Sequence, residues 1–267
     1  MPVEAAILVA VVILTATLIG LIVLIASRRR VAREDELRRE ASARGWQFSS
    51  KLERGNRVHR WTGSTDGVPW QAESMRQTQG QKNDRRRYIA RWHVAWSSGV
   101  TRPIVCMALP QGKETTPYAM AQSDGFFAKM AQKAAGFAFD KAVDMHFGKA
   151  LGDEVDAGAM QRVDATKLPG FAVMAADPKE GVRILAEGLE RSLADASARN
   201  QAVWSQKERP WVLLRPNGIS LARMERFRDI NELESFVRAG LDLTRAAKFG
   251  RPSRRSGLNP DATSSRS

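Results

Sequence analysis

The stretch RYIARWHVAW (87–96) decides the fold class of this chain, because its large apolar side chains recur at every second position. This period of two predicts a β-strand with two chemically different faces. The face that contains Arg91 and His93 should meet solvent, so the opposite, aromatic face is predicted to pack in a core. A surface that stacks single-stranded nucleic acid would carry aromatic and arginine side chains together, so the pattern disfavours nucleic acid as a partner. The aromatic face consists of Tyr88, Ala90, Trp92, Val94 and Trp96.

Shorter stretches with the same period lie on both sides of this strand. The turn sequence STDG (64–67) predicts an antiparallel hairpin between its two neighbours, and PNG (216–218) is an equally strong turn signal. The break SSGVTR (97–102) suggests that the central strand also returns antiparallel into the stretch that follows it. The further strands are expected at 57–63, 68–74, 103–110, 170–177, 201–206, 210–216 and 218–224.

Three stretches change to a period of three to four residues, which is typical of amphipathic helices. Ser123 or Asp124 is expected to cap the first, and Asp177 the second, with Pro178 at its first position. Lysines in the first helix would suit a membrane surface, but packing of its apolar face on a sheet is the favoured interpretation. Together these patterns predict an α+β fold with a mostly antiparallel sheet packed with helices. The helices are expected at about 123–151, 178–195 and 229–248.

The N-terminal segment carries no charged side chain over residues 5–26. About 20 apolar residues cross the roughly 30 Å of hydrocarbon in a bilayer, so this segment is predicted to be a transmembrane helix with lipid as its partner. A cleaved signal peptide is the alternative. It is disfavoured because MPVE (1–4) has no Lys or Arg, and because cleavage after Ser27 would put the bulky Ile25 where a small residue is required.

Four arginines, Arg28, Arg29, Arg30 and Arg33, follow the apolar segment directly. Because no Lys or Arg lies on its other side, the positive-inside bias predicts an external N-terminus and a cytoplasmic location for everything after Ser27. The same arginines are the candidate contacts for the headgroups of acidic phospholipids. A purely topological role for them is the simpler alternative.

A helical stalk is predicted to continue from the anchor over residues 28–45. Its acid-before-base pairs at i,i+4, such as Glu34 with Arg38, support the helix, and its sparse apolar residues indicate a solvated spacer. Such a helix would hold the following domain about 25 Å from the membrane. Gly45 is expected to end it, with Trp46 folding back on the last turn.

Sequence motifs for known catalytic and metal-binding sites do not occur in this chain. The three histidines, His59, His93 and His146, form no HExxH and have no second ligand at zinc-finger spacing. There is no GxGxxG after a strand, no phosphate-binding P-loop and no GxSxG. The sequence therefore assigns no catalytic residue, no metal ligand and no cofactor.

Two weaker candidates for a catalytic site remain in the sequence. Cys106 could act as a nucleophile with His59 or His93, but its surroundings, IVCMAL (104–109), are typical of a small buried hydrophobe. Asp153 and Glu154 form an acidic pair that could serve as acid and base only if folding placed them in a cleft. Solvated loop acids are the favoured interpretation of that pair.

The composition limits the classes of partner. The 267 residues carry a net charge of +13 and are 43% hydrophobic, which favours anionic partners and allows a sizeable core. A single cysteine excludes an intrachain disulfide framework and suits a reducing compartment.

The arginine-rich helix, RGWQF (44–48) and WTGSTDGVPWQAES (61–74) together resemble uncharacterised single-pass membrane proteins of bacteria. The resemblance covers about the first quarter of the chain and implies a location in the bacterial inner membrane. It transfers no functional residue.

The expected organisation is an anchor over 1–27, the stalk over 28–45 and an α+β domain over 46–249. The domain is one unit or two halves, 46–151 and 168–249, and a disordered basic tail follows over 250–267. The leading functional hypothesis is a membrane-anchored domain that binds an unidentified protein or an anionic ligand. The alternatives are an enzyme with an unrecognised site near the membrane and a basic module for acidic lipid or nucleic acid.

Overall fold

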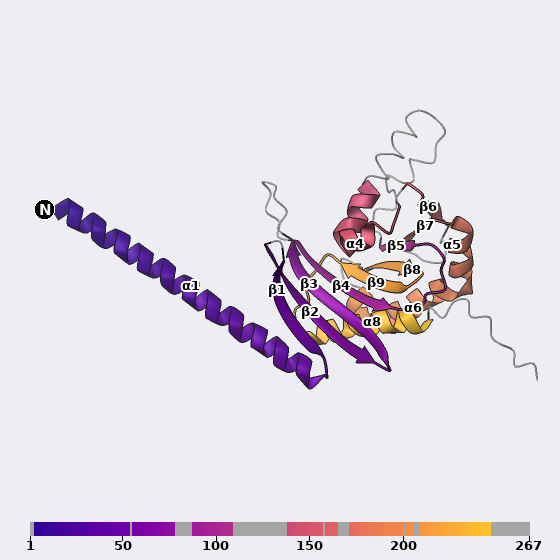
Figure 1. Ribbon diagram of the computed structural model, residues 1–267, viewed down its shortest axis with the longest axis horizontal. Helices are drawn as coiled ribbons and strands as arrows, with labels where there is room; N and C mark the ends of the chain where they lie inside the picture. Colours follow the sequence, from indigo (N-terminus) through magenta and orange to yellow (C-terminus); the bar gives the residue numbers. More distant parts are fainter. Residues whose placement is uncertain are drawn as a thin grey trace, which may run out of the picture.

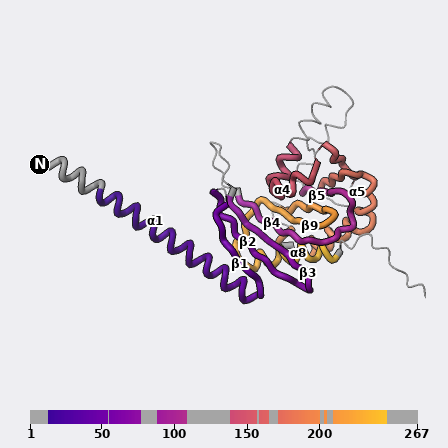
Figure 2. Tube along the Cα trace, in the orientation of Figure 1, coloured from indigo at the N-terminus to yellow at the C-terminus, as the bar shows by residue number. Residues whose placement is uncertain are grey.

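A long helix and a sheet packed with helices make up the chain in this computed structural model (Figure 1). Helix α1 (Val3–Ala43) projects from the body, and its C-terminal end meets the first strands (Figure 2). Side chains of α1 are described from Ile13 onward. The structure describes residues 3–53, 55–77, 87–108, 138–156, 158–164, 171–199, 201–204 and 209–246.

The described strands form a nine-stranded sheet in which every neighbouring pair is antiparallel. The order is β1-β2-β3-β4-β9-β8-β5-β7-β6. This confirms the α+β class and the mostly antiparallel sheet. The strands are β1 (Gln47–Glu53), β2 (Asn56–Thr65), β3 (Val68–Gln77), β4 (Arg87–Ala95), β5 (Ile104–Ala108), β6 (Gln161–Val163), β7 (Phe171–Ala175), β8 (Trp211–Arg215) and β9 (Gly218–Arg223).

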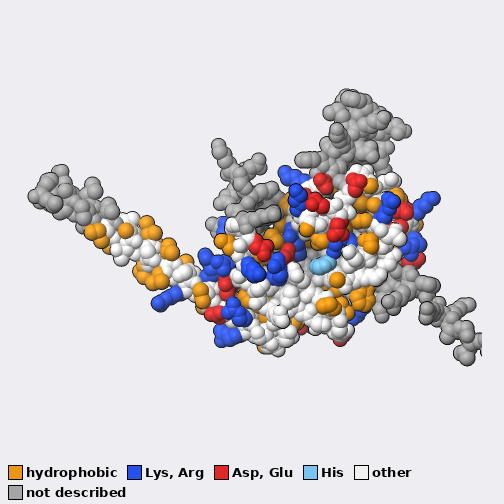
Figure 3. Space-filling view, viewed as in Figure 1, with side chains coloured by type: hydrophobic (Ala, Val, Ile, Leu, Met, Phe, Trp, Pro, Cys, Tyr) orange, Lys and Arg blue, Asp and Glu red, His pale blue; other side chains and the backbone are white. Residues whose placement is uncertain are grey.

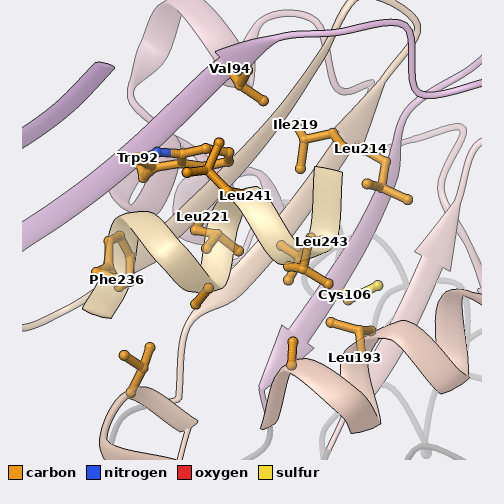
Figure 4. Close-up of a cluster of buried hydrophobic side chains, with 14 of the residues drawn as sticks. Trp92, Val94, Cys106, Leu193, Leu214, Ile219, Leu221, Phe236, Leu241 and Leu243 are labelled. Carbon is orange, nitrogen blue, oxygen red and sulfur yellow. The ribbon is translucent and has the colours of Figure 1, made fainter. Parts of the chain in front are cut away.

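The aromatic face of β4 is the centre of the larger core, as its alternation predicts. Trp92 and Val94 are fully buried, and they pack with residues of β9 and of helix α8 (Ile230–Ala246), such as Leu221 and Phe236 (Figure 4). Gly240 of α8 lies against the Trp92 ring, where an added Cβ would be 2.5 Å from ring carbons. The absence of a side chain on Gly240 therefore allows the helix to approach the sheet closely.

The opposite face of β4 is covered over Ile89 and Arg91, so the prediction that it meets solvent is wrong for this part, whereas Ala95 on the same face is exposed. Residues 138–147 form a helix on this side, and Phe139, Val143 and Phe147 belong to a second apolar cluster. The Arg91 side chain donates to the carbonyl oxygens of Met145 and His146. A long arginine can thus lie beneath a helix when its donors reach backbone acceptors.

Strand β5 does not pair with β4, which corrects the predicted antiparallel return at 97–102. The hairpin β8–β9 is inserted between them, with β9 paired to β4 and β8 paired to β5. The connection is held by Glu180, whose carboxylate accepts from Thr101 and from the Arg102 N–H. A long-range pairing of this kind leaves no mark on the local pattern of the sequence.

Both predicted hairpin turns are present. Thr65 pairs with Val68 across Asp66 and Gly67, whose φ values of 52° and 75° fit a left-handed two-residue turn. Strands β8 and β9 likewise close around residues 216 and 217.

The helices follow the predictions except at one place. Asp177 accepts from the N–H groups of Lys179 and Glu180, which confirms the predicted cap with Pro178 at the first turn. Residues 201–206 are predicted as a strand, but the described part is helical, because an apolar run of three residues does not distinguish helix from strand. Besides α1, α8 and the helix at 138–147, the described helices are α4 (Lys149–Gly152), α5 (Pro178–Ile184), the π-helical η1 (Leu185–Leu189), α6 (Glu190–Arg199) and α7 (Gln201–Trp204).

Some predictions fall on residues that the structure leaves out. The predicted helix over 123–151 is confirmed from 138 to 147 and at α4, and its earlier part lies outside the described residues. The predicted loop over 78–86 and the tail over 250–267 also lie outside them.

The end of α1 confirms Gly45 as a helix stop. Gly45 has φ 72°, its N–H donates to Ser42 O, and the Trp46 N–H donates to Ala41 O, which is the pattern of a Schellman motif. The predicted solvated spacer is wrong for this part of the helix, because Ala41 is fully buried and Leu37 packs against the core. The last turns of α1 are therefore part of the domain.

Over the part of the chain that the structure describes, no helix combines the length and the hydropathy of a membrane span. The transmembrane segment predicted at 5–26 stays a prediction at this point.

Candidate anion-binding pocket

A pocket of about 240 Å³ lies where α1 meets the sheet. One wall comes from α1, the floor from strands β2, β3 and β4, and the opposite wall from the loop between β9 and α8. The lining residues are Arg30, Arg33, Glu34, Leu37, Arg57, His59, Trp61, Ser74, Met75, Arg76, Tyr88, Arg226, Phe227, Arg228, Asp229 and Ile230.

Strand alternation places the floor residues together. Arg57, His59 and Trp61 are separated by two positions along β2, so they share one face of the sheet. The antiparallel register brings Ser74 of β3 opposite His59, and Arg76 continues the same face. The Schellman turn at the end of α1 reverses the chain into β1, so the last turns of the helix lie beside these strands.

An ion pair ties α1 to this floor. The Glu34 carboxylate accepts from Arg57 at 2.7 Å, and its oxygen lies 3.9 Å from His59 Nε2. A second contact follows further along the helix, where Arg44 pairs with Glu234 of α8 at 3.1 Å. Glu34 therefore bonds across to the domain, and its predicted i,i+4 partner Arg38 pairs with Asp35 instead.

The loop between β9 and α8 is fixed by a buried ion pair. Arg223 has no exposed side-chain surface, and its Nη2 lies 2.9 Å from Glu232. Glu232 also accepts from the Arg228 N–H, while Asp229 accepts from the Glu232 N–H as the helix cap. The guanidinium carbon of Arg223 also lies 5.3 Å from the ring centroid of Phe227 and 5.2 Å from that of Phe236.

Aromatic rings form the inner surface next to this loop. The ring of Phe227 lies edge-on to Trp61, with centroids 5.8 Å apart. On the rim, the guanidinium of Arg226 lies 5.2 Å from the centre of the Tyr88 ring. The pocket therefore combines an apolar interior with a basic rim.

Six arginines and two carboxylates line the pocket, so its charge is strongly positive. Among the described residues, Arg57 pairs with Glu34 and Arg228 with Glu225, whereas Arg33 and Arg226 lie near no carboxylate. Figure 3 shows Lys and Arg side chains gathered where the helix meets the body. This excess of fixed positive charge favours an anionic ligand.

Burial lowers the pKa of His59. The neighbouring Glu34 opposes this shift, while Arg57 and Arg33 add to it. At neutral pH the imidazole is uncharged and can donate or accept a hydrogen bond in the pocket.

Two of the four arginines proposed from the sequence as headgroup contacts line the pocket. Arg30 and Arg33 lie in its wall, whereas Arg28 and Arg29 lie on α1 outside it. The sequence reasoning missed Arg57, Arg76, Arg226 and Arg228. Their signal was weak: RVHRW and RFRD place arginines beside aromatics, which also occurs in ordinary strands and loops.

In the predicted acidic pair Asp153 and Glu154, the second carboxylate is engaged by an arginine. Glu154 forms a close ion pair with Arg215, at 2.8 Å, and Arg215 is almost fully buried. Arg215 in turn lies 3.3 Å from His93, whose pKa is lowered by burial and by this positive charge. The carboxylate thus neutralises a buried guanidinium, which is a structural role.

The pairing of Cys106 with a histidine is also excluded by the fold. Cys106 is fully buried in β5, and burial raises the pKa of its thiol to about 12. Strands β9 and β8 separate β5 from β4, which carries His93, and β2 with His59 lies further away. An inaccessible, protonated thiol is not a nucleophile.

His146 gives a testable pH dependence of stability. Its ring stacks on Trp211 at 3.9 Å, and burial lowers its pKa to about 4, with the Ala142 carbonyl opposing and Arg91 adding to the shift. Between pH 6.5 and 4 the unfolded chain binds a proton that the folded chain does not. Stability should therefore fall by about 3 kcal/mol as the pH drops through this range.

The measurement is urea unfolding of the full chain in a mild neutral detergent at pH 7, 6, 5 and 4. Replacement His146→Gln removes this proton linkage, so the variant should lose clearly less stability than the wild type between pH 6.5 and 4. An identical pH dependence in both proteins would contradict a buried neutral imidazole at this position.

Comparison of the chain with protein-family models, with curated proteins and with solved structures found no match. The functional assignment therefore depends on the geometry of this chain alone.

Proposed function

We propose that the chain is a single-pass membrane protein whose α+β domain is a binding module for an anionic partner. Residues 5–26 cross the inner membrane of a bacterium, the N-terminus lies outside, and the domain lies in the cytoplasm. The pocket between α1 and the sheet is the binding site.

The exposed apolar surface of α1 carries this proposal. Nine Ile, Leu and Val side chains between residues 13 and 25 are exposed, from 43% at Ile25 to 71% at Leu14. They surround the helix on all sides, whereas a helix that packs on a protein surface has one apolar stripe. A helix that is apolar all round needs an apolar environment, and a bilayer supplies one.

Length and flanking charge support the same interpretation. A helix over residues 5–26 is about 33 Å long, which matches the roughly 30 Å of bilayer hydrocarbon. Four arginines follow within two turns, and they favour retention of that end on the cytoplasmic side.

The chemistry of the pocket supports binding. Its six guanidinium groups offer hydrogen-bond donors and no acceptor, so they attract an anionic ligand. Glu34, the carboxylate nearest to the floor, is already paired with Arg57. A fixed basic rim around an aromatic interior is suited to holding a ligand.

Membrane insertion is tested by alkaline carbonate extraction of bacterial membranes that contain the full chain. The wild type should stay with the membrane pellet, and a deletion of residues 5–26 should move to the supernatant. Release of the wild type by carbonate would contradict the proposal that residues 5–26 span the membrane.

Orientation is tested in spheroplasts with a small membrane-impermeant maleimide. The buried Cys106 gives a low background, so single cysteines can be introduced as Pro2→Cys and as Lys51→Cys, an exposed position of β1. Pro2→Cys should react in intact spheroplasts, and Lys51→Cys only after lysis. Labelling of Lys51→Cys before lysis would contradict the cytoplasmic location of the domain.

A further inference from the structure

We propose that the pocket binds the phosphate-bearing headgroup of an anionic membrane lipid, with the start of the lipid's apolar part against its aromatic interior. This inference depends on the proposed anchor, because the anchor brings the pocket to the membrane surface.

The rim offers guanidinium groups that are free to bind phosphate. Arg33 has only a long contact of 3.4 Å with the Arg228 carbonyl, and Arg226 contacts the ring of Tyr88. Planar guanidinium groups form paired hydrogen bonds with phosphate oxygens, which a lysine does not. A phosphate between the α1 wall and the loop wall can therefore be held from two sides.

Buried donors within the pocket point to the same chemistry. Arg76 Nε and His59 Nε2 are buried and have no hydrogen-bond partner among the described residues. Buried polar groups in native proteins are usually hydrogen-bonded, so a ligand that carries oxygen atoms would supply partners for these two nitrogens. The oxygens of a headgroup would supply acceptors.

The interior selects an amphipathic ligand over a simple anion. Leu37, Trp61 and Phe227 line the pocket beside the arginines, together with Met75 and Ile230. A free phosphate ion would leave this apolar surface in contact with water, whereas the glycerol and first methylenes of a lipid would cover it. The volume of about 240 Å³ suits a headgroup and is too small for two acyl chains.

The position of the pocket along α1 places it at the depth of lipid headgroups. Arg30 follows Ala26, the last residue of the apolar segment, by roughly 6 Å along the helix axis, and Arg33 by roughly 10 Å. The polar layer on one side of a bilayer is about 5–8 Å thick. Arg30 therefore lies within the headgroup layer of the cytoplasmic leaflet, and Arg33 lies at the inner border of that layer.

Binding of short-chain lipids to the full chain in neutral detergent micelles is measured by isothermal titration calorimetry. The probes are dihexanoyl phosphatidylglycerol, dihexanoyl phosphatidylcholine and free glycerol 3-phosphate. The pocket variant Arg33→Gln/Arg226→Gln changes two exposed side chains, which leaves the fold intact. The control Arg38→Gln/Arg39→Gln also removes two positive charges, from positions of α1 that do not line the pocket.

We expect the wild type to bind phosphatidylglycerol at least about tenfold more tightly than the pocket variant, because two arginine–phosphate contacts are lost. The control variant should bind within about twofold of the wild type, and phosphatidylcholine should bind at least about tenfold more weakly.

Four outcomes would overturn the inference. Equal losses in the pocket and control variants would assign binding to diffuse charge, and equal affinity for phosphatidylcholine would remove the preference for anions. Glycerol 3-phosphate that binds as tightly as the lipid would assign the pocket to a soluble phosphorylated compound. If none of the probes binds, the proposed lipid site is wrong. The membrane anchor is tested independently by carbonate extraction, so the two proposals can fail separately.

Discussion

The replacement Glu232→Gln should lower the free energy of unfolding by about 3 kcal/mol, because it removes the carboxylate that pairs with the fully buried Arg223 guanidinium. In a domain of this size such a loss corresponds to a fall in Tm of roughly 6–12 °C. The measurement is urea unfolding of the full chain in neutral detergent, followed by tryptophan fluorescence.

A matched control lies two residues further along α8. Glu234 pairs with Arg44 and Arg238 but keeps 37% of its side chain exposed, so Glu234→Gln should cost at most about 1 kcal/mol. The double variant Arg223→Met/Glu232→Gln removes the buried charge altogether and should regain most of the lost stability. A double variant as unstable as Glu232→Gln alone would show that the uncompensated charge is not the cause.

The second large effect concerns the contact between Trp92 and Gly240. Trp92→Ala should cost about 3–5 kcal/mol, because it empties the centre of the larger core. Gly240→Ala should cost about 1–3 kcal/mol, because its Cβ would lie 2.5 Å from carbons of the Trp92 ring.

The effect of Gly240→Ala on the free energy of unfolding should change sign when Trp92→Ala is also present, which tests the contact directly. Once the indole is removed by Trp92→Ala, the added methyl group at Gly240 has room. Alanine is then the better helix former by about 1 kcal/mol, so Gly240→Ala should stabilise the Trp92→Ala background. A destabilising effect of Gly240→Ala in both backgrounds would contradict this packing, and both are measured by the same urea titration.

Strong local signals predicted most elements of the fold. The alternation in 87–96 identified the core face of β4, and Asp177, Pro178 and Gly45 marked helix ends that the structure confirms. Each of these signals acts within a few residues, through capping, backbone conformation or the period of a strand. Local physics of this kind can be read from a single sequence.

The errors concern contacts between distant segments. The second face of β4 carries Arg91 and His93 and looks solvent-facing, but the helix at 138–147 covers it and accepts from Arg91. The connection at 97–102 looks like a hairpin, but β8 and β9 take the intervening places in the sheet. In both cases the local pattern is compatible with two partners, and only the folded chain selects one.

The arginines of the candidate pocket likewise divide into those that the sequence identified and those that only the fold brings together. The sequence identified Arg30 and Arg33 because they belong to a dense basic cluster after an apolar segment. Arg57, Arg76 and Arg226 come from β2, β3 and a loop far along the chain, and nothing in their local spacing connects them. The antiparallel register and the return of the chain after α1 bring them together.

The sequence by itself determined the period of the strands, the caps of the helices and the long uncharged segment followed by arginines. These properties depend on neighbouring residues, so the order of residues is enough to specify them. The tertiary structure alone decided the strand order, the docking of the end of α1 on the domain and the gathering of six arginines around one pocket. Burial and electrostatics between segments distant in the chain decide such features, and they act only when the whole chain is folded.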